Sequence, residues 1–355
     1  LVILIRSNTL GEVSMSIKSS VTLFLLSISL ILSNCGNQQH KAQPYFDSGI
    51  SKFAAQDLQG AITDLDQAIQ LYPDFAIAYN ARGLVRLKLQ DMPGALADFD
   101  QALKLEPANP EFYLNRGHIY AETQKHDEAI RDFTQATKLD PQFAEAFANL
   151  GTVYLNTGNL AEALKKYDHA IQLNPKNIIF HNDRGLIRIQ QKNYQAALAD
   201  FDTSITLNPN FPESYYHRGM THFRMENYPA ALNDYQKALE LEPKYSDVYA
   251  AIGNLKFQQN QPQAAMESYN QCLAINPNDA KAYFNRATIN LEMGNRDQAC
   301  LDWHKSLELG MPVAADLIKE YCPESDQSDP SANQKNLSVE LDTRNRKGKK
   351  VNTTR

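Results

Sequence analysis

Hydrophobic and polar positions along this chain recur with a period of 34 residues. Each copy holds two stretches in which apolar residues fall three or four apart, the spacing of one face of an α-helix. A short polar segment such as "KHDE" or "NTGN" separates the two stretches, and "LDP", "LNP" or "LEP" closes the second. Proline cannot continue a helix and disfavours helical geometry in the residue before it. The pattern therefore predicts a helical hairpin that repeats without insertion over residues 42–313.

Small residues fill two columns of the repeat, and a large aromatic residue fills a third. The first column holds glycine in seven copies and Ala287 in the eighth, and the second holds alanine in all eight. The aromatic residue follows that alanine four positions later, with Leu65 in its place in the first copy. Small residues let two helix backbones approach closely, and the aromatic ring fills the space beside them. A single hairpin of this size cannot bury its apolar stripe, whereas stacked copies can.

These columns resemble the tetratricopeptide repeat, a helix–turn–helix unit of the same period. The resemblance implies an all-α fold, a right-handed α-solenoid of eight repeats, in which the first helices line a concave groove. The expected repeats are 42–75, 76–109, 110–143, 144–177, 178–211, 212–245, 246–279 and 280–313.

The last repeat ends differently from the others, because Gly310 stands where a helix would stop and Pro312 can open another. Val313, Leu317 and Tyr321 then lie along one helix face. Residues 313–322 are therefore predicted to form a capping helix that covers the final repeat.

The N-terminal segment is typical of export. Residues 15–34 combine a basic start at Lys18 with an apolar run that is too short to span a membrane, which is the composition of a signal peptide. The stretch that ends in Cys35 resembles a bacterial lipobox, which implies lipidation of this cysteine, as by palmitate, and a linker over residues 35–41. Residues 1–14 have no role in this interpretation, and translation is expected to begin at Met15.

Gly36 follows the lipidated position in place of an aspartate that retains some lipoproteins at the inner membrane. A lipoprotein of the cell envelope, at the outer membrane, is therefore expected, and a cytoplasmic protein is the alternative. Residues 323–355 are polar, lack periodicity and end in "RNRKGKKVNTTR", which predicts a disordered tail.

An arginine precedes the repeat glycine in four copies and Ala287 in a fifth, and an aspartate stands three residues after the repeat alanine in the same five copies. Where the arginine is replaced by Leu150 or Ile252, the aspartate is replaced by Lys166 or Ser268. This joint variation predicts ion pairs between the two helices of one hairpin. The pairs are Arg82 with Asp98, Arg116 with Asp132, Arg184 with Asp200, Arg218 with Asp234 and Arg286 with Asp302.

A structural clamp is favoured for these pairs, because buried charges are almost always paired. An arginine ladder that binds an acidic ligand is the functional alternative. Recent duplication of both columns, without any contact between them, is a third interpretation.

The tetratricopeptide resemblance implies that a partner peptide contacts the first helix of each repeat. The groove residues expected on this basis are Asn80, Leu84, Leu114, Asn115, His118, Asn149, Asn182, Leu186, Tyr216, Met220, Phe284 and Asn285. Apolar anchors with asparagine amides suit an extended or helical segment of another protein. The alternative is that several of these side chains only fill space between helices.

The chain contains no glycine-rich phosphate loop, His-Glu-x-x-His or Cys-x-x-Cys pattern, so no catalytic residue, cofactor or metal site is predicted. The formal net charge of −6 argues against a nucleic-acid partner. No small-molecule substrate is expected.

Three cysteines remain after Cys35. Cys272 takes a slot that holds alanine or serine in other repeats, and it is expected to be a small buried filler. Cys300 and Cys322 lie almost equally far from the turn at Gly310, so antiparallel helices would bring them level. Export would permit a disulfide between them, although spacing alone leaves both the bonded and the free state open.

A non-catalytic scaffold is the function expected from these features, tethered to a membrane through a lipid on Cys35 and presenting a groove to a protein or peptide. A cytoplasmic adaptor similar to a co-chaperone is one alternative. An envelope enzyme with a site assembled in the groove is the other.

Overall fold

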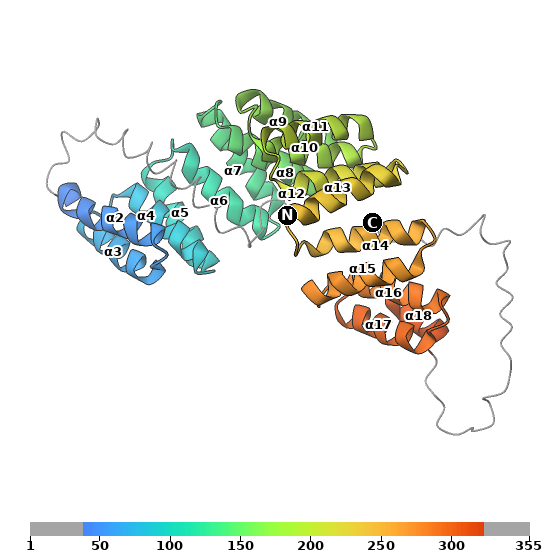
Figure 1. Cartoon of the computed structure of the whole chain (residues 1–355). Helices are drawn as coiled ribbons and strands as arrows, with labels where there is room; N and C mark the ends of the chain where they lie inside the picture. The colour runs from blue at the N-terminus through green and yellow to red at the C-terminus, as the bar shows by residue number, and fades with distance from the viewer. Residues whose placement is uncertain (1–37, 323–355) are drawn as a thin grey trace, which may run out of the picture. The chain divides into compact units, whose positions relative to one another are not determined.

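The computed structural model describes residues 38–322, and every regular element within this range is an α-helix (Figure 1). The predicted all-α class is therefore confirmed. The expected signal peptide at 15–34, the lipidated Cys35 and the tail at 323–355 lie outside the described residues.

Within residues 38–322 the helices form eight hairpins and one extra helix. The first helices of the hairpins are α2 (Gln38–Ala54), α4 (Ala76–Lys88), α6 (Pro110–Glu122), α8 (Ala144–Asn156), α10 (Ile178–Gln190), α12 (Pro212–Arg224), α14 (Ser246–Gln258) and α16 (Ala280–Glu292). The second helices are α3 (Leu58–Leu71), α5 (Met92–Leu105), α7 (His126–Leu139), α9 (Leu160–Leu173), α11 (Tyr194–Leu207), α13 (Tyr228–Leu241), α15 (Pro262–Ile275) and α17 (Arg296–Glu308). The extra helix is α18 (Ala314–Tyr321).

From the second copy onward, each first helix begins at the first residue of the expected repeat, as Ala76 and Pro110 illustrate. The first helix of the first copy, α2, is already helical at Gln38, where the described residues begin. Asp57, Asp91 and Asn159 cap second helices by accepting a hydrogen bond from a backbone N–H of the first turn. The polar segments between the helices therefore both end one helix and start the next.

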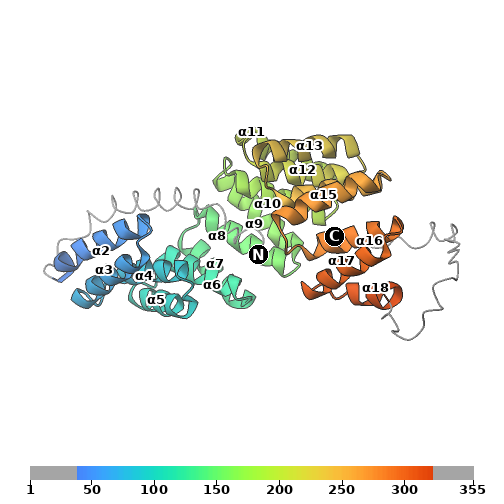
Figure 2. The same ribbon diagram turned by 60° about the horizontal axis from the view of Figure 1, so that its bottom comes forward.

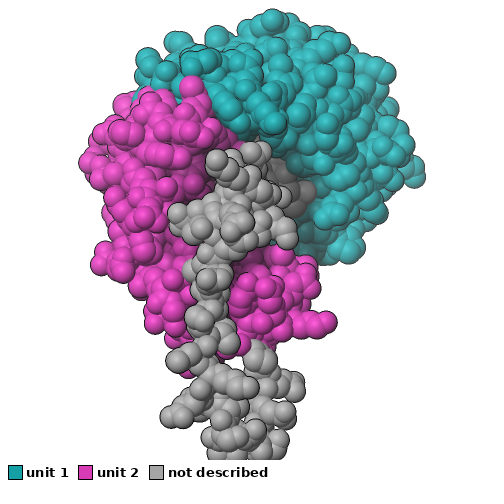
Figure 3. Space-filling view, turned by 90° about the vertical axis from the view of Figure 1, so that its right-hand side faces the viewer, with its two compact units in different colours: residues 1–207 teal, residues 208–355 magenta. Residues whose placement is uncertain are grey.

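The chain divides into two compact units, residues 1–207 and residues 208–355 (Figure 3). Within each unit the two helices of a hairpin pack together, and each second helix packs on the first helix of the next hairpin, as α3 does on α4 and α13 on α14. First helices of neighbouring hairpins also touch, as α6 and α8 do in the first unit and α14 and α16 in the second. Hairpins that nest in sequence order are the arrangement of an α-solenoid.

The small columns lie where the two helices of a hairpin approach most closely. A Cβ atom added to Gly117 would lie 2.7 Å from Cε1 of Phe133, and one added to Gly185 would lie 2.6 Å from Cε1 of Phe201. Both aromatic rings are fully buried. The aromatic ring of each of these two repeats therefore leaves no room for a side chain at the glycine position. The ring fills the space that a larger residue at that position would need.

Left-handed backbone closes the turn inside each hairpin, and the residue there is usually not glycine. Gly158 and Gly294 adopt a positive φ in two turns, whereas a glutamine does so in three others. These glutamines are Gln56, Gln90 and Gln124. Residues with a Cβ adopt this geometry at a cost of roughly 1–2 kcal/mol. The packed helices on both sides therefore hold these turns in a conformation that the local sequence does not favour.

Candidate functional site

The arginine and aspartate columns meet across the helices of each hairpin. Nε and Nη2 of Arg116 donate to Oδ2 and Oδ1 of Asp132, each at 2.7 Å. The same two-point contact joins Arg82 to Asp98 at 3.0 and 2.6 Å, and Arg286 to Asp302 at 2.8 and 2.7 Å. Arg184 and Arg218 bind Asp200 and Asp234 in the same way. Planar, bidentate pairing of this kind is the strongest form of hydrogen-bonded ion pair.

Both members of each pair are withdrawn from solvent. The five aspartate side chains are only 3–7% exposed, and the arginine side chains are 15–23% exposed. The hydrogen bonds to Asp132 are the main reason why the pKa of Arg116 is raised, although burial opposes them. Tyrosine rings cover part of these guanidinium groups, with Arg82 5.4 Å from the ring centre of Tyr79. An acidic ligand would therefore have to compete with carboxylates that these arginines already bind.

A second acid, which the sequence interpretation missed, extends three of the five pairs into the preceding repeat. Nη1 of Arg82 donates to Asp66 at 2.6 Å, and Nη1 of Arg116 donates to Asp100 at 2.8 Å. Nη1 of Arg184 donates to Asp168, also at 2.8 Å. Unlike the buried partner, these carboxylates are 43–52% exposed. Each of these arginines therefore fastens its own hairpin and also ties that hairpin to the one before it.

The copies without this arginine use different contacts. In the fourth copy Leu150 is 2% exposed, and Nζ of Lys166 lies 4.0 Å from Glu162 of its own helix. In the first copy Ser48 donates to Asp64 at 2.5 Å, and Nζ of Lys52 lies 2.7 Å from the same carboxylate. The lone aspartate of the first copy is therefore also paired, through a lysine one helical turn beyond the arginine column.

The expected groove residues form contacts among themselves along the first helices. The amide of Asn115 on α6 donates to Asn80 on α4 at 2.8 Å, and the amide nitrogen of Asn149 on α8 lies 3.1 Å from Nε2 of His118. Burial lowers the pKa of His118 to about 4, so its ring is neutral near pH 7. In the second unit Asn285 on α16 donates to Asn254 on α14 at 3.1 Å. These polar side chains therefore connect neighbouring first helices.

The expected groove residues differ in how much surface they keep. Asn149, Asn182 and Phe284 are 5–8% exposed, so little of their surface is left for a ligand. The remaining members of the set are half-buried. Leu84 and Leu114 pack at the edge of hydrophobic clusters, and the ring of Tyr216 lies tilted against that of Tyr245, with 5.3 Å between the ring centres.

Carboxylates on the same face of α6 and α8 were not among the residues selected from the sequence. Glu111, Asn115, His118 and Glu122 are spaced four, three and four residues apart, which places them along one face of α6. Glu145 stands one turn before Asn149 on α8. Within residues 38–322 none of these three glutamates is in an ion pair, and burial raises the pKa of Glu111. In the sequence, the only indication of this acidic face was the presence of glutamates close to Leu114.

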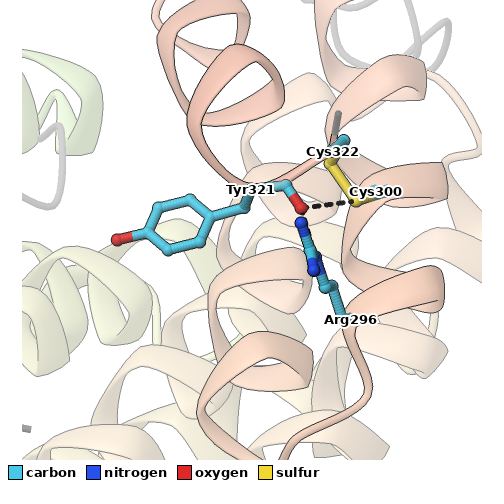
Figure 4. The surroundings of a disulfide bond; sticks show 4 residues. All are labelled: Arg296, Cys300, Tyr321 and Cys322. Carbon is cyan, nitrogen blue, oxygen red and sulfur yellow. Dashed lines mark hydrogen bonds between the residues drawn. A yellow bond between two sulfur atoms is a disulfide. The ribbon is translucent and has the colours of Figure 1, made fainter. Parts of the chain in front are cut away.

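The two cysteines near the end of the array are joined. Cys300 on α17 and Cys322 after α18 form a disulfide, with their Cα atoms 5.7 Å apart (Figure 4). Cys272 is a free thiol that is fully buried, and burial raises its pKa to about 12. A buried protonated thiol packs as a small apolar group.

Within residues 38–322 the side chains form no metal-binding cluster and the helices include no membrane span. No group of three or more His, Cys, Asp or Glu side chains in this range is placed to hold a metal ion. No helix in the same range has both the length and the apolar character needed to cross a membrane.

Comparison with protein families places the repeats. A family model described as "TPR repeat" matches residues 117–158, 185–226 and 253–294. Four models described as "Tetratricopeptide repeat" match residues 46–110, 99–131, 144–177 and 212–245. No match was found among curated protein sequences.

Solved structures of repeat proteins are similar in fold. A tetratricopeptide repeat protein from Parabacteroides merdae is 22% identical, with a TM-score of 0.60, over 69% of this chain and 97% of that one. The Cut9–Hcn1 hetero-tetramer of APC/C is 21% identical, with a TM-score of 0.57, over 75% of this chain. The match spans about half, 52%, of that relative's length. PilF from Pseudomonas aeruginosa is 20% identical, with a TM-score of 0.50, over 61% of this chain and 98% of that one.

All the family models reported above are tetratricopeptide repeat models, and proteins built from this repeat are typically interaction scaffolds rather than enzymes. The nested hairpins, the glycine, alanine and aromatic columns and the family matches from residue 46 to residue 294 agree. The chain belongs to the tetratricopeptide repeat proteins, with an all-α solenoid fold.

Proposed function

We propose that this protein is a non-catalytic scaffold that binds a segment of a partner protein along its first helices, and that a lipid on Cys35 holds it at a bacterial envelope membrane. The observation that carries the binding proposal is the face of α6 and α8 described above. It combines half-buried Leu114 with the amide of Asn115 and with the carboxylates of Glu111 and Glu145, which form no ion pair with any residue of 38–322.

The chemistry of this face selects the kind of partner. Glu111, Glu122 and Glu145 supply negative charge, whereas the side chains between them are neutral. A segment that carries lysine or arginine beside an apolar anchor would pair with the carboxylates and cover Leu114. An acidic segment would meet like charge. We therefore assign a basic, partly apolar segment as the ligand of this surface.

A photo-crosslinking experiment in cells tests the proposed surface. A photoreactive phenylalanine analogue at Leu114 is expected to trap a discrete partner, because that position lies on the binding face. The matched control places the same group at Ala97, which is exposed on the second helix α5. Equal adduct patterns at the two positions would contradict the proposal.

Charge removal then tests the partner chemistry on the partner so identified. Glu111→Gln with Glu145→Gln is expected to weaken binding roughly two- to thirtyfold, since each exposed pair contributes about 0.2–1 kcal/mol. The loss should shrink as salt is added. Glu267→Gln, which makes the same charge change on the second helix α15, is the control and should leave the affinity unchanged. An affinity insensitive to both changes would refute a basic ligand.

The anchor is a separate proposal, supported by the lipobox-like sequence before Cys35. Cys35→Ala is expected to abolish incorporation of radiolabelled palmitate and to release the protein from sedimented membranes. A variant that still sediments and is still labelled would exclude this cysteine as the lipidation site. Wild-type protein without label in the soluble fraction would favour the cytoplasmic adaptor.

A further inference from the structure

The final hairpin is covered by a helix that is too short to be stable alone. The helix α18 has 8 residues, whereas isolated helices shorter than roughly 12–15 residues are marginal in water. In Figures 1 and 2 it lies beside α16 and α17. It takes the place that the first helix of another repeat would occupy, and no second helix follows it within the described residues.

The surface below α18 is apolar. Phe284, Ala287 and Trp303 form one buried cluster with Ala314 of the cap, and Leu317 and Ile318 of the cap pack against it. Phe284 and Trp303 are 5% and 1% exposed. Removal of α18 would therefore bring the apolar end of the last repeat into contact with solvent, including Phe284 of the groove set.

Only a few contacts besides this apolar packing hold the cap. Arg296 donates from Nε to the backbone carbonyl of Tyr321, and the disulfide joins the next residue, Cys322, to Cys300 (Figure 4). Of the cap's residues only Ala314 is buried. Trp303 makes closure of the cap less favourable in free energy, because its Nε1 is buried under the cap without a hydrogen-bond partner within the described residues. The covalent bond therefore supplies what the short helix lacks.

We propose that the Cys300–Cys322 disulfide is a redox latch that keeps α18 closed over the last repeat, and that its reduction lets the cap open. The bond closes a loop of 22 residues in sequence separation. A cross-link over a loop of this length favours the closed state by about two orders of magnitude. Both cysteines are only half-buried, so a small thiol can reach them.

The chemistry of opening is thiol–disulfide exchange with an external dithiol. One thiolate of the dithiol attacks a sulfur of the protein disulfide, and the other cysteine leaves as a thiolate. The second thiolate of the dithiol then attacks the mixed disulfide and frees the first cysteine. Cys300 and Cys322 end as thiols after taking up two protons, and the dithiol ends as a cyclic disulfide.

Trp303 is a built-in reporter, because it is the only tryptophan in the chain. Its ring lies 5.9 Å from that of Tyr321, directly below the cap. On adding dithiothreitol to folded protein, the tryptophan emission is expected to shift to the red. Tryptic cleavage after Lys319, an exposed residue of α18, is expected to speed up at least tenfold. Fragments are reduced after quenching, so that a cut in the oxidised protein is also seen.

Two variants guard this test. Cys272→Ala removes the free thiol and should respond to dithiothreitol as the wild type does. Cys300→Ser with Cys322→Ser should show the open-cap emission and cleavage without any reductant, and the wild-type comparison stands even if this variant folds poorly. If reduced and oxidised wild type have the same tryptophan emission, and their rates of cleavage after Lys319 agree within twofold, the proposed latch is wrong. The disulfide then only stabilises the closed cap. Only the use of Phe284 by a partner rests on the proposed function, and neither readout requires a partner.

Discussion

Arg116→Leu is expected to lower the free energy of unfolding by about 3–5 kcal/mol, because it leaves the carboxylate of Asp132 buried without its cation. That carboxylate is 7% exposed and accepts both hydrogen bonds of the guanidinium. The fourth copy carries leucine and lysine at these two positions. Adding Asp132→Lys to Arg116→Leu recreates that solution and should restore much of the loss. Urea denaturation of the two variants measures both values.

The second acid of the same arginine provides the matched control. Asp100 is 52% exposed, and exposed pairs contribute about 0.2–1 kcal/mol. Asp100→Asn should therefore change stability far less than Asp132→Asn, although both carboxylates bind Arg116. If the single Arg116→Leu variant and the double variant unfold at the same urea concentration, the clamp interpretation fails.

Gly185→Ala is expected to destabilise the protein by about 1–3 kcal/mol, the usual cost of overpacking a core. An alanine in a helix would otherwise gain roughly 0.5–1 kcal/mol over glycine. The new Cβ would lie 2.6 Å from both Cε1 and Cζ of Phe201, whose ring is fully buried and has no room to move. The clash therefore outweighs the gain in helix propensity.

A double-mutant cycle shows whether the ring is the cause. Phe201→Leu installs the side chain that the first copy has at Leu65, and by itself it leaves a cavity. Combined with Gly185→Ala it removes the clash and refills part of that cavity, so the double variant should be more stable than the sum of the single effects. Strict additivity in urea denaturation would show that the two positions do not share one volume.

The positions of the helices could be predicted from sequence because several independent signals coincide in every copy. The proline that ends one repeat and the capping residues of the next leave little choice of boundary, as the start of α6 at Pro110 shows. The first copy lacks a preceding repeat for comparison, and there α2 runs from Gln38, the first described residue, across the expected repeat boundary at residue 42. Comparison between repeats cannot locate the start of the first repeat, because no earlier copy is there to compare it with.

The arginine contacts were predicted in part, because joint variation within one repeat reveals only partners of that repeat. The second acid stands two residues after the first and varies with the arginine of the following copy. Asp66 and Asp100 precede arginine-containing copies, whereas Thr134 precedes Leu150. Comparing the residue at this second position with the arginine position of the following copy would have revealed the second acid.

The groove was the least predictable part. The position of a residue within the repeat identifies the helix face on which it lies. It does not show whether a polar side chain on that face is already hydrogen-bonded to the neighbouring helix. Asn80 and Asn115 bond to each other, and Asn149 contacts His118. Glu111, Glu122 and Glu145 of that face stand outside the repeat columns that the family resemblance assigns to the groove, so the resemblance did not identify them.

The two-sided contact of each arginine makes the joints between repeats unequal. Arg82 and Arg116 bond across the first and second joints, and Arg184 does so across the fourth, whereas Leu150 and Thr134 stand at the third. In a linear array, cooperativity depends on the coupling between nearest neighbours. Among the four joints of the first unit, only the one between the third and fourth hairpins lacks this tie. An exposed pair contributes about 0.2–1 kcal/mol, so in mild denaturant hydrogen exchange at this joint is expected to exceed exchange at the bridged joints by up to about fivefold. An array of similar repeats would in this way contain one interface that opens more readily than the others.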